Sequence, residues 1–158
     1  MKKFIKKPNP KYRSLMTPHP ESQREKDFSL LWQQKRYEEA LNTSFPDQWV
    51  WFAEHIDKES VCAYPTVAGA GEVMSEDAFS VIHEAFPFET RFNHPLEIDG
   101  YKFIWFSPPV VEKADFNSTQ DNIFMAKPLY RTVYSEDFVN LWKLHRFTDH
   151  EFVEITKP

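Results

Sequence analysis

The stretch MSEDAFSVIHEAFPFETRFNHPLEIDGYKFIWFSPP, residues 74–109, predicts a helix followed by a β-hairpin. Ser75 is a good N-cap, and Glu76 and Asp77 place negative charge where the helix dipole favours it. Four apolar residues then recur at i, i+4, i+7 and i+8, the spacing of one buried helical stripe: Ala78, Ile82, Ala85 and Phe86. The pattern predicts a helix over about 75–86.

The dipeptide Asp99-Gly100 predicts the turn of the hairpin, because both central residues of such a turn need positive φ. A two-residue turn fixes which residues lie opposite one another: Ile98 and Tyr101, Leu96 and Phe103, His94 and Trp105 on one face, and Glu97 and Lys102, Pro95 and Ile104 on the other. Proline lacks an N–H to share with a second neighbour, so we expect Arg91–Ile98 to lie at a sheet edge.

Length and composition predict one domain spanning 1–158. A chain of 158 residues with 16% aromatic residues is long enough for one core and too short to expect two. No apolar run approaches ~20 residues, so no transmembrane helix and no membrane partner are expected. The start MKKFIKKPNP lacks the apolar region of a signal peptide, and the single Cys62 excludes an internal disulfide. These features favour a cytoplasmic protein.

Charge is divided unevenly along the chain. Residues 1–36 carry ten Lys or Arg against three Asp or Glu, whereas the remainder carries nine against twenty-one. We interpret residues 1–40 as basic N-terminal strands and a loop on a solvated surface. No nucleic-acid partner is expected, because no recognisable module accompanies the basic stretch. The acidic body instead favours a basic protein partner.

The rest of the chain predicts an α+β fold with a mostly antiparallel sheet and two main helices. The second helix is expected at about 136–146, with Phe138, Leu141, Trp142 and His145 on one face. Two interpretations fit Phe28–Ala40: a strand followed by a short helix, or one helix with an apolar face. Extended segments are predicted at Lys3–Lys7, Tyr12–Thr17, Gln48–Phe52, Val61–Val67, Glu72–Met74, Val110–Asp115, Asn122–Ala126, Tyr130–Tyr134 and Glu151–Thr156. The motif Ser-Glu-Asp opens both helices, at Ser75 and again 60 residues later at Ser135. This repeat is consistent with a duplicated strand–helix–strand unit.

No motif indicates catalysis, a cofactor or a metal. His83 has no second histidine four residues on, and His145 and His150 flank a helix end where a dipole-stabilised histidine is ordinary. Cys62 lies in an apolar segment and is expected to be a buried, inert thiol. The chain is therefore not predicted to be an enzyme.

An ordered set of segments resembles a bacterial family, the immunity proteins of polymorphic toxin systems known as immunity family eleven. The segments are Met74 to Ala78, His94 to Tyr101, Trp105 to Asp115, Asn122 to Phe124, Tyr134 to Glu136 and Glu151 to Ile155. The run Val110-Val111-Glu112-Lys113-Ala114-Asp115, followed by Ser118, matches the family's Val-Val-x-x-x-Asp pattern. The family-like core spans about 71–156. It departs from the pattern at Thr148-Asp149-His150, where the family has a glycine.

The resemblance implies a binding protein that neutralises a cognate toxin domain by stoichiometric complex formation in the cytoplasm. An interface of standard size buries roughly 1,600 Å² around a few aromatic and charged anchors. An acidic body suits a basic toxin, for example a nuclease. The contact residues expected for it are Trp51, Glu54, Asp57 and Glu59, or the loop with Glu112 and Asp115.

Two other functions remain open from the residues. A small hydrolase that reverses a toxin's covalent modification would use carboxylates such as Glu112, Asp115 and Asp121, and would act at substoichiometric amounts. A structural subunit of a bacterial assembly would expose an apolar patch and self-associate.

Overall fold

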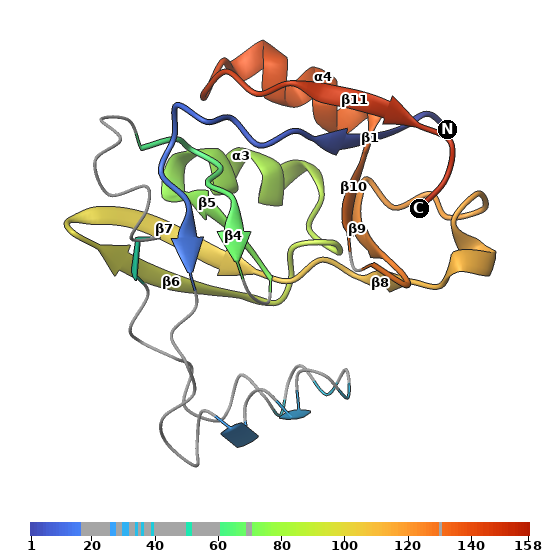
Figure 1. Cartoon of the computed structure of the whole chain (residues 1–158), viewed down its shortest axis with the longest axis horizontal. Coiled ribbons are helices and arrows are strands. Elements are labelled where there is room, and N and C mark those ends of the chain that lie inside the picture. Colours follow the sequence, from blue (N-terminus) through green and yellow to red (C-terminus); the bar gives the residue numbers. More distant parts are fainter. Residues whose placement is uncertain are drawn as a thin grey trace.

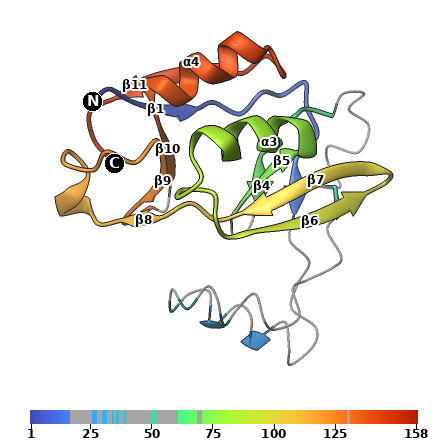
Figure 2. The same cartoon turned by 180° about the vertical axis from the view of Figure 1, so that it is seen from behind.

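The helix and the hairpin predicted from residues 74–109 both form in the computed structural model. The structure describes residues 1–16, 26–27, 30–31, 34, 36, 39, 50–51, 61–68, 71–129 and 131–158. Within them it is a small α+β domain with two α-helices and mostly antiparallel strands (Figures 1 and 2). None of the helices in these ranges is both long and apolar enough to cross a membrane.

The hairpin lies in a three-stranded antiparallel sheet with the order β5 (Glu72–Ser75), β7 (Tyr101–Phe106), β6 (Asn93–Ile98). Its register is the predicted one, with His94 opposite Trp105 and Pro95 opposite Ile104. Asp99 and Gly100 have φ of 50° and 82°, as the turn requires. Strand β6 is an edge of this sheet, which confirms the reading of Pro95.

A five-stranded sheet has the order β11 (Phe152–Ile155), β1 (Lys3–Lys6), β10 (Arg131–Ser135), β9 (Ile123–Ala126), β8 (Val110–Val111). Its pairs are antiparallel except β8 with β9, which is parallel. The N-terminal strand β1 lies between the two strands that flank the second helix in sequence. The chain ends are thereby joined in one sheet (Figure 1).

A third sheet is made of two-residue strands in the order β3 (Val50–Trp51), β2 (Leu15–Met16), β4 (Val67–Ala68). The predicted strand Tyr12–Thr17 was too long, because within its described part only Leu15–Met16 forms a strand and Tyr12 makes a single bridge. In Val61–Val67 only the last residue is in a strand. Most of Gln48–Phe52 and of Phe28–Ala40 lies outside the described residues.

Helix α3 (Glu76–Ala85) starts at the predicted N-cap, where Ser75 Oγ accepts a hydrogen bond from the Ala78 backbone N–H at 3.3 Å. Its buried residues are Ala78, Phe79 and Ile82. The predicted stripe was wrong at Ala85, which is exposed in the last turn, and Phe86 is only half-buried. Phe79 takes the inward position because it packs on Phe106 of the sheet, with ring centroids 5.4 Å apart.

Helix α4 (Glu136–His145) repeats the same start 60 residues later. Ser135 Oγ accepts from the Phe138 N–H at 3.1 Å, and the buried residues are Phe138, Val139 and Trp142. The buried positions of α3 and α4 thus coincide after a shift of 60. His145 was predicted on the buried face but is exposed, because it lies in the last turn and stacks on Phe147 at 5.3 Å.

Both helices contribute to one core between the sheets. This core joins Met74, Ile82 and Phe106 to Tyr134, Phe138 and Trp142, with Tyr64 among them. The opposite face of the β5–β7–β6 sheet covers a second cluster with Leu15, Val73, Phe103 and Trp105. A third, around Phe116 and Phe124, lies against β8, β9 and β10.

The predicted strand Val110–Asp115 ends early. Strand β8 stops at Val111, and a 3-10 turn, η2 (Lys113–Asp115), follows it because the Glu112 carbonyl accepts the Asp115 N–H at 3.0 Å. The predicted strands Asn122–Ala126, Tyr130–Tyr134 and Glu151–Thr156 are confirmed within a residue or two at each end.

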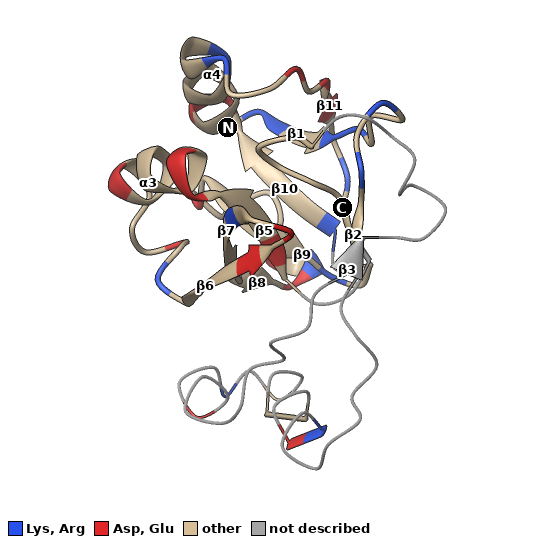
Figure 3. Cartoon of the chain, turned by 90° about the vertical axis from the view of Figure 1, so that its left-hand side faces the viewer, with Lys and Arg blue, Asp and Glu red and all other residues tan. Residues whose placement is uncertain are grey.

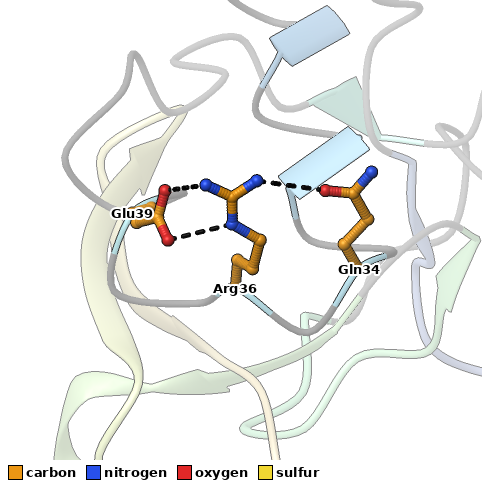
Figure 4. Close-up of polar contacts among 3 residues, drawn as sticks. All are labelled: Gln34, Arg36 and Glu39. Atoms are coloured by element: carbon orange, nitrogen blue, oxygen red, sulfur yellow. Dashed lines mark hydrogen bonds and ion pairs between the residues drawn. The ribbon is translucent and has the colours of Figure 1, made fainter.

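The described positions of the basic N-terminal segment include one exposed polar group. Arg36 Nε donates to Glu39 Oε1 at 2.9 Å, a second guanidinium nitrogen forms an ion pair with Glu39 Oε2, and another donates to Gln34 Oε1 at 3.4 Å (Figure 4). The Arg36 and Glu39 side chains remain about half exposed. Such a group belongs to a solvated surface. The interpretation of residues 1–40 as basic strands and a loop on a solvated surface was nevertheless wrong in two places: Lys3 and Lys6 of β1 are held inside the domain by its packing, and positions 26–27 and 30–31 are helical.

Candidate functional site

Two of the three predicted contact residues that the structure describes, Glu112 and Asp115, lie in one exposed loop. Glu112 follows β8, and its Oε1 accepts from Lys127 Nζ at 2.6 Å. Asp115 ends η2, and its backbone carbonyl accepts the N–H groups of Ser118 and Thr119 at 3.1 and 3.0 Å. Both acidic residues are exposed, and the Glu112 carboxylate is already paired with Lys127.

In the part of the chain that the structure describes, no other predicted contact residue is shown beside this loop. Trp51 pairs with Leu15 in the third sheet, and nothing further is described of its side chain. Glu54, Asp57 and Glu59 lie outside the described residues.

The carboxylates considered for hydrolysis have separate partners. Asp121 Oδ2 accepts from Thr119 Oγ1 at 3.0 Å, whereas Glu112 is paired with Lys127. In the part of the chain that the structure describes, no group of three or more His, Cys, Asp or Glu side chains could hold a metal ion.

The sequence did not predict a polar cluster that lies inside the domain. Lys6 of β1 donates from Nζ to the Tyr64 carbonyl at 2.7 Å, and the ammonium lies 3.5 Å from the centroid of the Tyr64 ring. Burial lowers the pKa of Lys6 to about 8, although the negative charge of Glu72 partly offsets that effect. The residues are far apart in sequence, and no spacing rule connects them.

Two tyrosines and a glutamate complete this cluster. Tyr134 donates its hydroxyl hydrogen to the Tyr64 hydroxyl oxygen at 2.8 Å, and Thr132 donates to Glu72 Oε1. Burial, together with the charge of Glu72, raises the pKa of both tyrosines well above its ordinary value. The phenols therefore stay protonated, and the cluster acts as a buried structural network.

His150 closes the cluster on the side of the C-terminal turn. Its ring lies 5.7 Å from those of Tyr12 and Trp142 and 6.4 Å from that of Tyr64. Both ring nitrogens are buried, with no hydrogen-bond partner among the described residues. Burial, and then the positive charge of Lys6, lower the pKa of His150 to about 4. The imidazole is neutral at pH 7.

The remaining sequence candidates have structural roles. Thr90 Oγ1 donates to the Phe86 carbonyl at 2.7 Å and so accepts from His83 Nδ1, also at 2.7 Å, because a hydroxyl has only one hydrogen. His83 thus secures the C-terminal end of α3. Cys62 is buried, as predicted, and burial raises the pKa of its thiol.

The outer face of α3 is acidic and ends at an exposed aromatic ring. Glu76, Asp77 and Glu84 are exposed on this helix, which has no lysine or arginine (Figure 3). Phe88, three residues past the helix, is 81% exposed, the highest value for a large apolar side chain in the described ranges. Periodicity identified the helix, but only the fold shows that Phe88 is left outside the core.

The chain was compared with protein-family models, with curated proteins and with solved structures, and none of them matches it. Its function is therefore inferred from its own residues and their arrangement.

Proposed function

We propose that this chain is an immunity protein that binds a cognate bacterial toxin domain and neutralises it as a stoichiometric complex in the cytoplasm. The observation that carries this proposal is the order of segments from Met74 to Ile155 that resemble immunity family eleven. The segments include the strand–helix start at Ser75, the Asp99-Gly100 hairpin and the second start at Ser135.

The surface chemistry supports binding to a basic partner. The loop of residues 112–121 carries exposed Glu112 and Asp115, and α3 carries three further exposed carboxylates. Complementary charge accelerates association and suppresses wrong partners. A toxin domain with a basic active-site surface, such as a nuclease, would have its substrate-binding face covered by this acidic surface.

A titration tests this function. The C-terminal domain encoded by the gene immediately upstream would be purified and mixed with increasing amounts of this protein, and complex formation and residual toxicity would be measured together. We expect protection to saturate at an equimolar, stable complex. Protection at a small fraction of the toxin concentration, with no complex, would instead show an enzyme acting on the toxin's product.

Variants in the loop test the predicted contacts. Charge reversal by Glu112→Lys with Asp115→Lys should weaken the complex. The matched control is Asp149→Lys, a charge reversal at an exposed residue of the C-terminal turn. The predicted contacts Trp51, Glu54, Asp57 and Glu59 would be replaced in a second series. Unchanged affinity in both series would remove these residues from the interface.

A further inference from the structure

We propose that this chain is a fused pair of two copies of one module, residues 3–98 and 101–155, and that a second copy of the chain can supply the partner that either module needs. This inference is independent of the proposed function. Within the described residues, and apart from β3 and η2, both modules have the same order of elements. The corresponding elements are β1 and β7, β2 and β8, β4 and β9, β5 and β10, α3 and α4, and β6 and β11.

Each module gives its first strand to the sheet of the other module. Strand β1 of the first module lies between β10 and β11 of the second, and β7 of the second lies between β5 and β6 of the first (Figure 2). All four of these pairs are antiparallel. The exchange is reciprocal, which is what a two-fold axis between two copies of a module requires.

The register of the two exchanged strands is the same, counted from the N-cap serines Ser75 and Ser135. The corresponding cross-strand pairs are Ser75–Phe103 and Ser135–Lys3, Met74–Ile104 and Tyr134–Phe4, Leu96–Phe103 and Ile155–Lys3, Pro95–Ile104 and Glu154–Phe4, His94–Trp105 and Val153–Ile5, and Asn93–Phe106 and Phe152–Lys6. A shift of two residues in any strand would keep the same side chains inward and the same topology. Topology alone therefore does not fix this register, and the agreement favours a duplication.

The two helix starts agree in their backbone contacts as well as in their side-chain caps. The Ser75 N–H donates to the Ala63 carbonyl at 2.7 Å, and the Ser135 N–H donates to the Asn122 carbonyl at 2.9 Å. Each acceptor precedes the third strand of its own module, β4 or β9. The modules thus share contacts that lie outside the Ser-Glu-Asp motif.

The modules differ most between their second and third strands. The first module has residues 17–66 there, which include β3, and the second has residues 112–122, which include η2. The pairs on either side of this difference remain alike, because β2 with β4 and β8 with β9 are both parallel. Insertions within one repeat leave the rest of its elements in place, so the difference is compatible with a duplication.

Residues that correspond in the two modules touch at the interface between them. Thr132 corresponds to Glu72, 60 residues earlier, and its hydroxyl donates to the Glu72 carboxylate. In a two-fold pair, a residue touches its own counterpart only close to the axis. Ile82 and Trp142, which also correspond, lie in the core that α3 and α4 share. The contact between the modules therefore has the self-complementary form of a dimer interface.

The turn Asp99-Gly100 is the connection between the two modules. It joins β6 of the first module to β7 of the second. Because each module needs a strand from the other, a chain whose turn cannot close would obtain both missing contacts from a second copy in the same state. Exchange of identical elements is a common route to dimers, since it restores the contacts of the monomer.

Deletion of Gly100 should convert the protein into such an exchanged dimer. It leaves one residue between Ile98 and Tyr101, fewer than the two of a tight hairpin turn. A single chain could turn only by drawing Ile98, which is 5% exposed, out of the core, whereas an exchanged dimer keeps it paired with Tyr101 of the other copy. Light scattering after size-exclusion chromatography should show about tenfold or more dimer than for the wild type at equal concentration, because burial of such a side chain is worth at least that factor.

Two further variants serve as controls. Deletion of Gln120, an exposed residue in a loop of the second module, should leave the protein as monomeric as the wild type, because exchange about that loop would divide a module. Insertion of about four Gly or Ser residues between Asp99 and Gly100 lets the turn close easily within one chain and should give no more dimer than the wild type. Circular dichroism and urea unfolding would show which variants are folded.

A refolding experiment covers a deletion variant that does not fold. Wild-type chains with and without an affinity tag would be unfolded together in urea and refolded at ~1 mM, near the effective concentration that a short connection provides. Tagged chains should then retain untagged chains in a dimer that survives dilution. The lengthened turn should lower the yield of this mixed dimer about fivefold or more, because it favours closure within one chain.

The outcomes decide the proposal without reference to a toxin. A Gly100 deletion variant that is folded and monomeric would overturn it. If that variant is unfolded, wild-type chains that refold without any mixed dimer would overturn it instead. Dimers that are equally abundant with the lengthened turn would show association through another surface, and would also contradict exchange at the junction of the modules.

Discussion

Tyr64 and Tyr134, seventy residues apart, meet in the core with their hydroxyl oxygens 2.8 Å apart and their rings nearly perpendicular, at 88°. Tyr134 donates this hydrogen bond from β10, and Tyr64 accepts it from the segment after Cys62. Both side chains are fully buried, so neither hydroxyl can turn to water instead. The pair connects the five-stranded sheet to the middle of the chain.

Loss of both hydroxyls from this pair should cost less than the sum of the two single losses. Tyr64→Phe leaves the buried Tyr134 hydroxyl without its acceptor, and we expect the free energy of unfolding to fall by about 1–3 kcal/mol. Tyr64→Phe with Tyr134→Phe removes both polar groups and should be less destabilising than the sum of the single changes. Urea unfolding of the four proteins measures this coupling. Strict additivity would show that the hydrogen bond contributes nothing.

The two described glycines with positive φ offer a matched pair. A Cβ at Gly71, whose φ is +81°, would lie 2.5 Å from Trp105 Nε1, whereas a Cβ at Gly100, with φ +82°, would have nothing within 4 Å. Gly71→Ala should therefore combine backbone strain with a clash against a buried ring and destabilise by more than about 2 kcal/mol. Gly100→Ala should cost about 1 kcal/mol, from strain alone. Thermal unfolding would compare them, and equal losses would contradict the close packing of Trp105.

The stability of the protein should fall in mild acid because of His150. Its pKa is about 4 in the folded state against an ordinary value of 6.5, so between these values the unfolded chain binds more protons. Stability from this group is complete above pH 6.5 and is lost as the pH falls toward 4. Because the His150 residue is only half-buried, solvent screening limits the loss to the order of 1 kcal/mol.

His150→Phe provides the comparison for this acid effect. The variant keeps a ring between Tyr12 and Trp142 but cannot take up a proton. Between pH 7 and pH 5, the urea midpoint should fall further in the wild type than in the variant, because the two proteins have the same carboxylates and differ only at residue 150. Parallel pH profiles would show that His150 is not the acid-sensitive group.

The two serine N-caps should differ in their contribution to stability. Ser75 caps α3 with one side-chain hydrogen bond, at 3.3 Å, whereas Ser135 caps α4 at 3.1 Å and also donates to Asn122 Oδ1 at 2.8 Å. Ser75→Ala should cost about 1 kcal/mol and Ser135→Ala about 2 kcal/mol. Chemical unfolding of both variants measures the difference. A larger loss at Ser75 would contradict the role given to the Ser135–Asn122 bond.

Predictions from the sequence succeeded where the deciding interactions are local. The turn at Asp99-Gly100 is fixed by its own backbone requirement, and it determined every cross-strand pair of β6 and β7. The starts of α3 and α4 are likewise fixed by Ser75 and Ser135. Boundaries that depend on distant partners were predicted less well: Leu15–Met16 pairs only as far as β3 and β4 extend, and Ala85 is exposed although its helical angle places it on the buried stripe.

Periodicity, capping and turn chemistry act within a few residues, and they were enough to predict the α+β class, the two helices and the hairpin register. Which groups from different elements meet depends instead on the tertiary structure. It brought Lys6, Tyr64 and Tyr134 into one buried network, and it joined Glu89, which follows α3, to Asn122 at the start of β9. Such contacts depend on how separate elements pack, and a one-dimensional pattern carries no record of that packing.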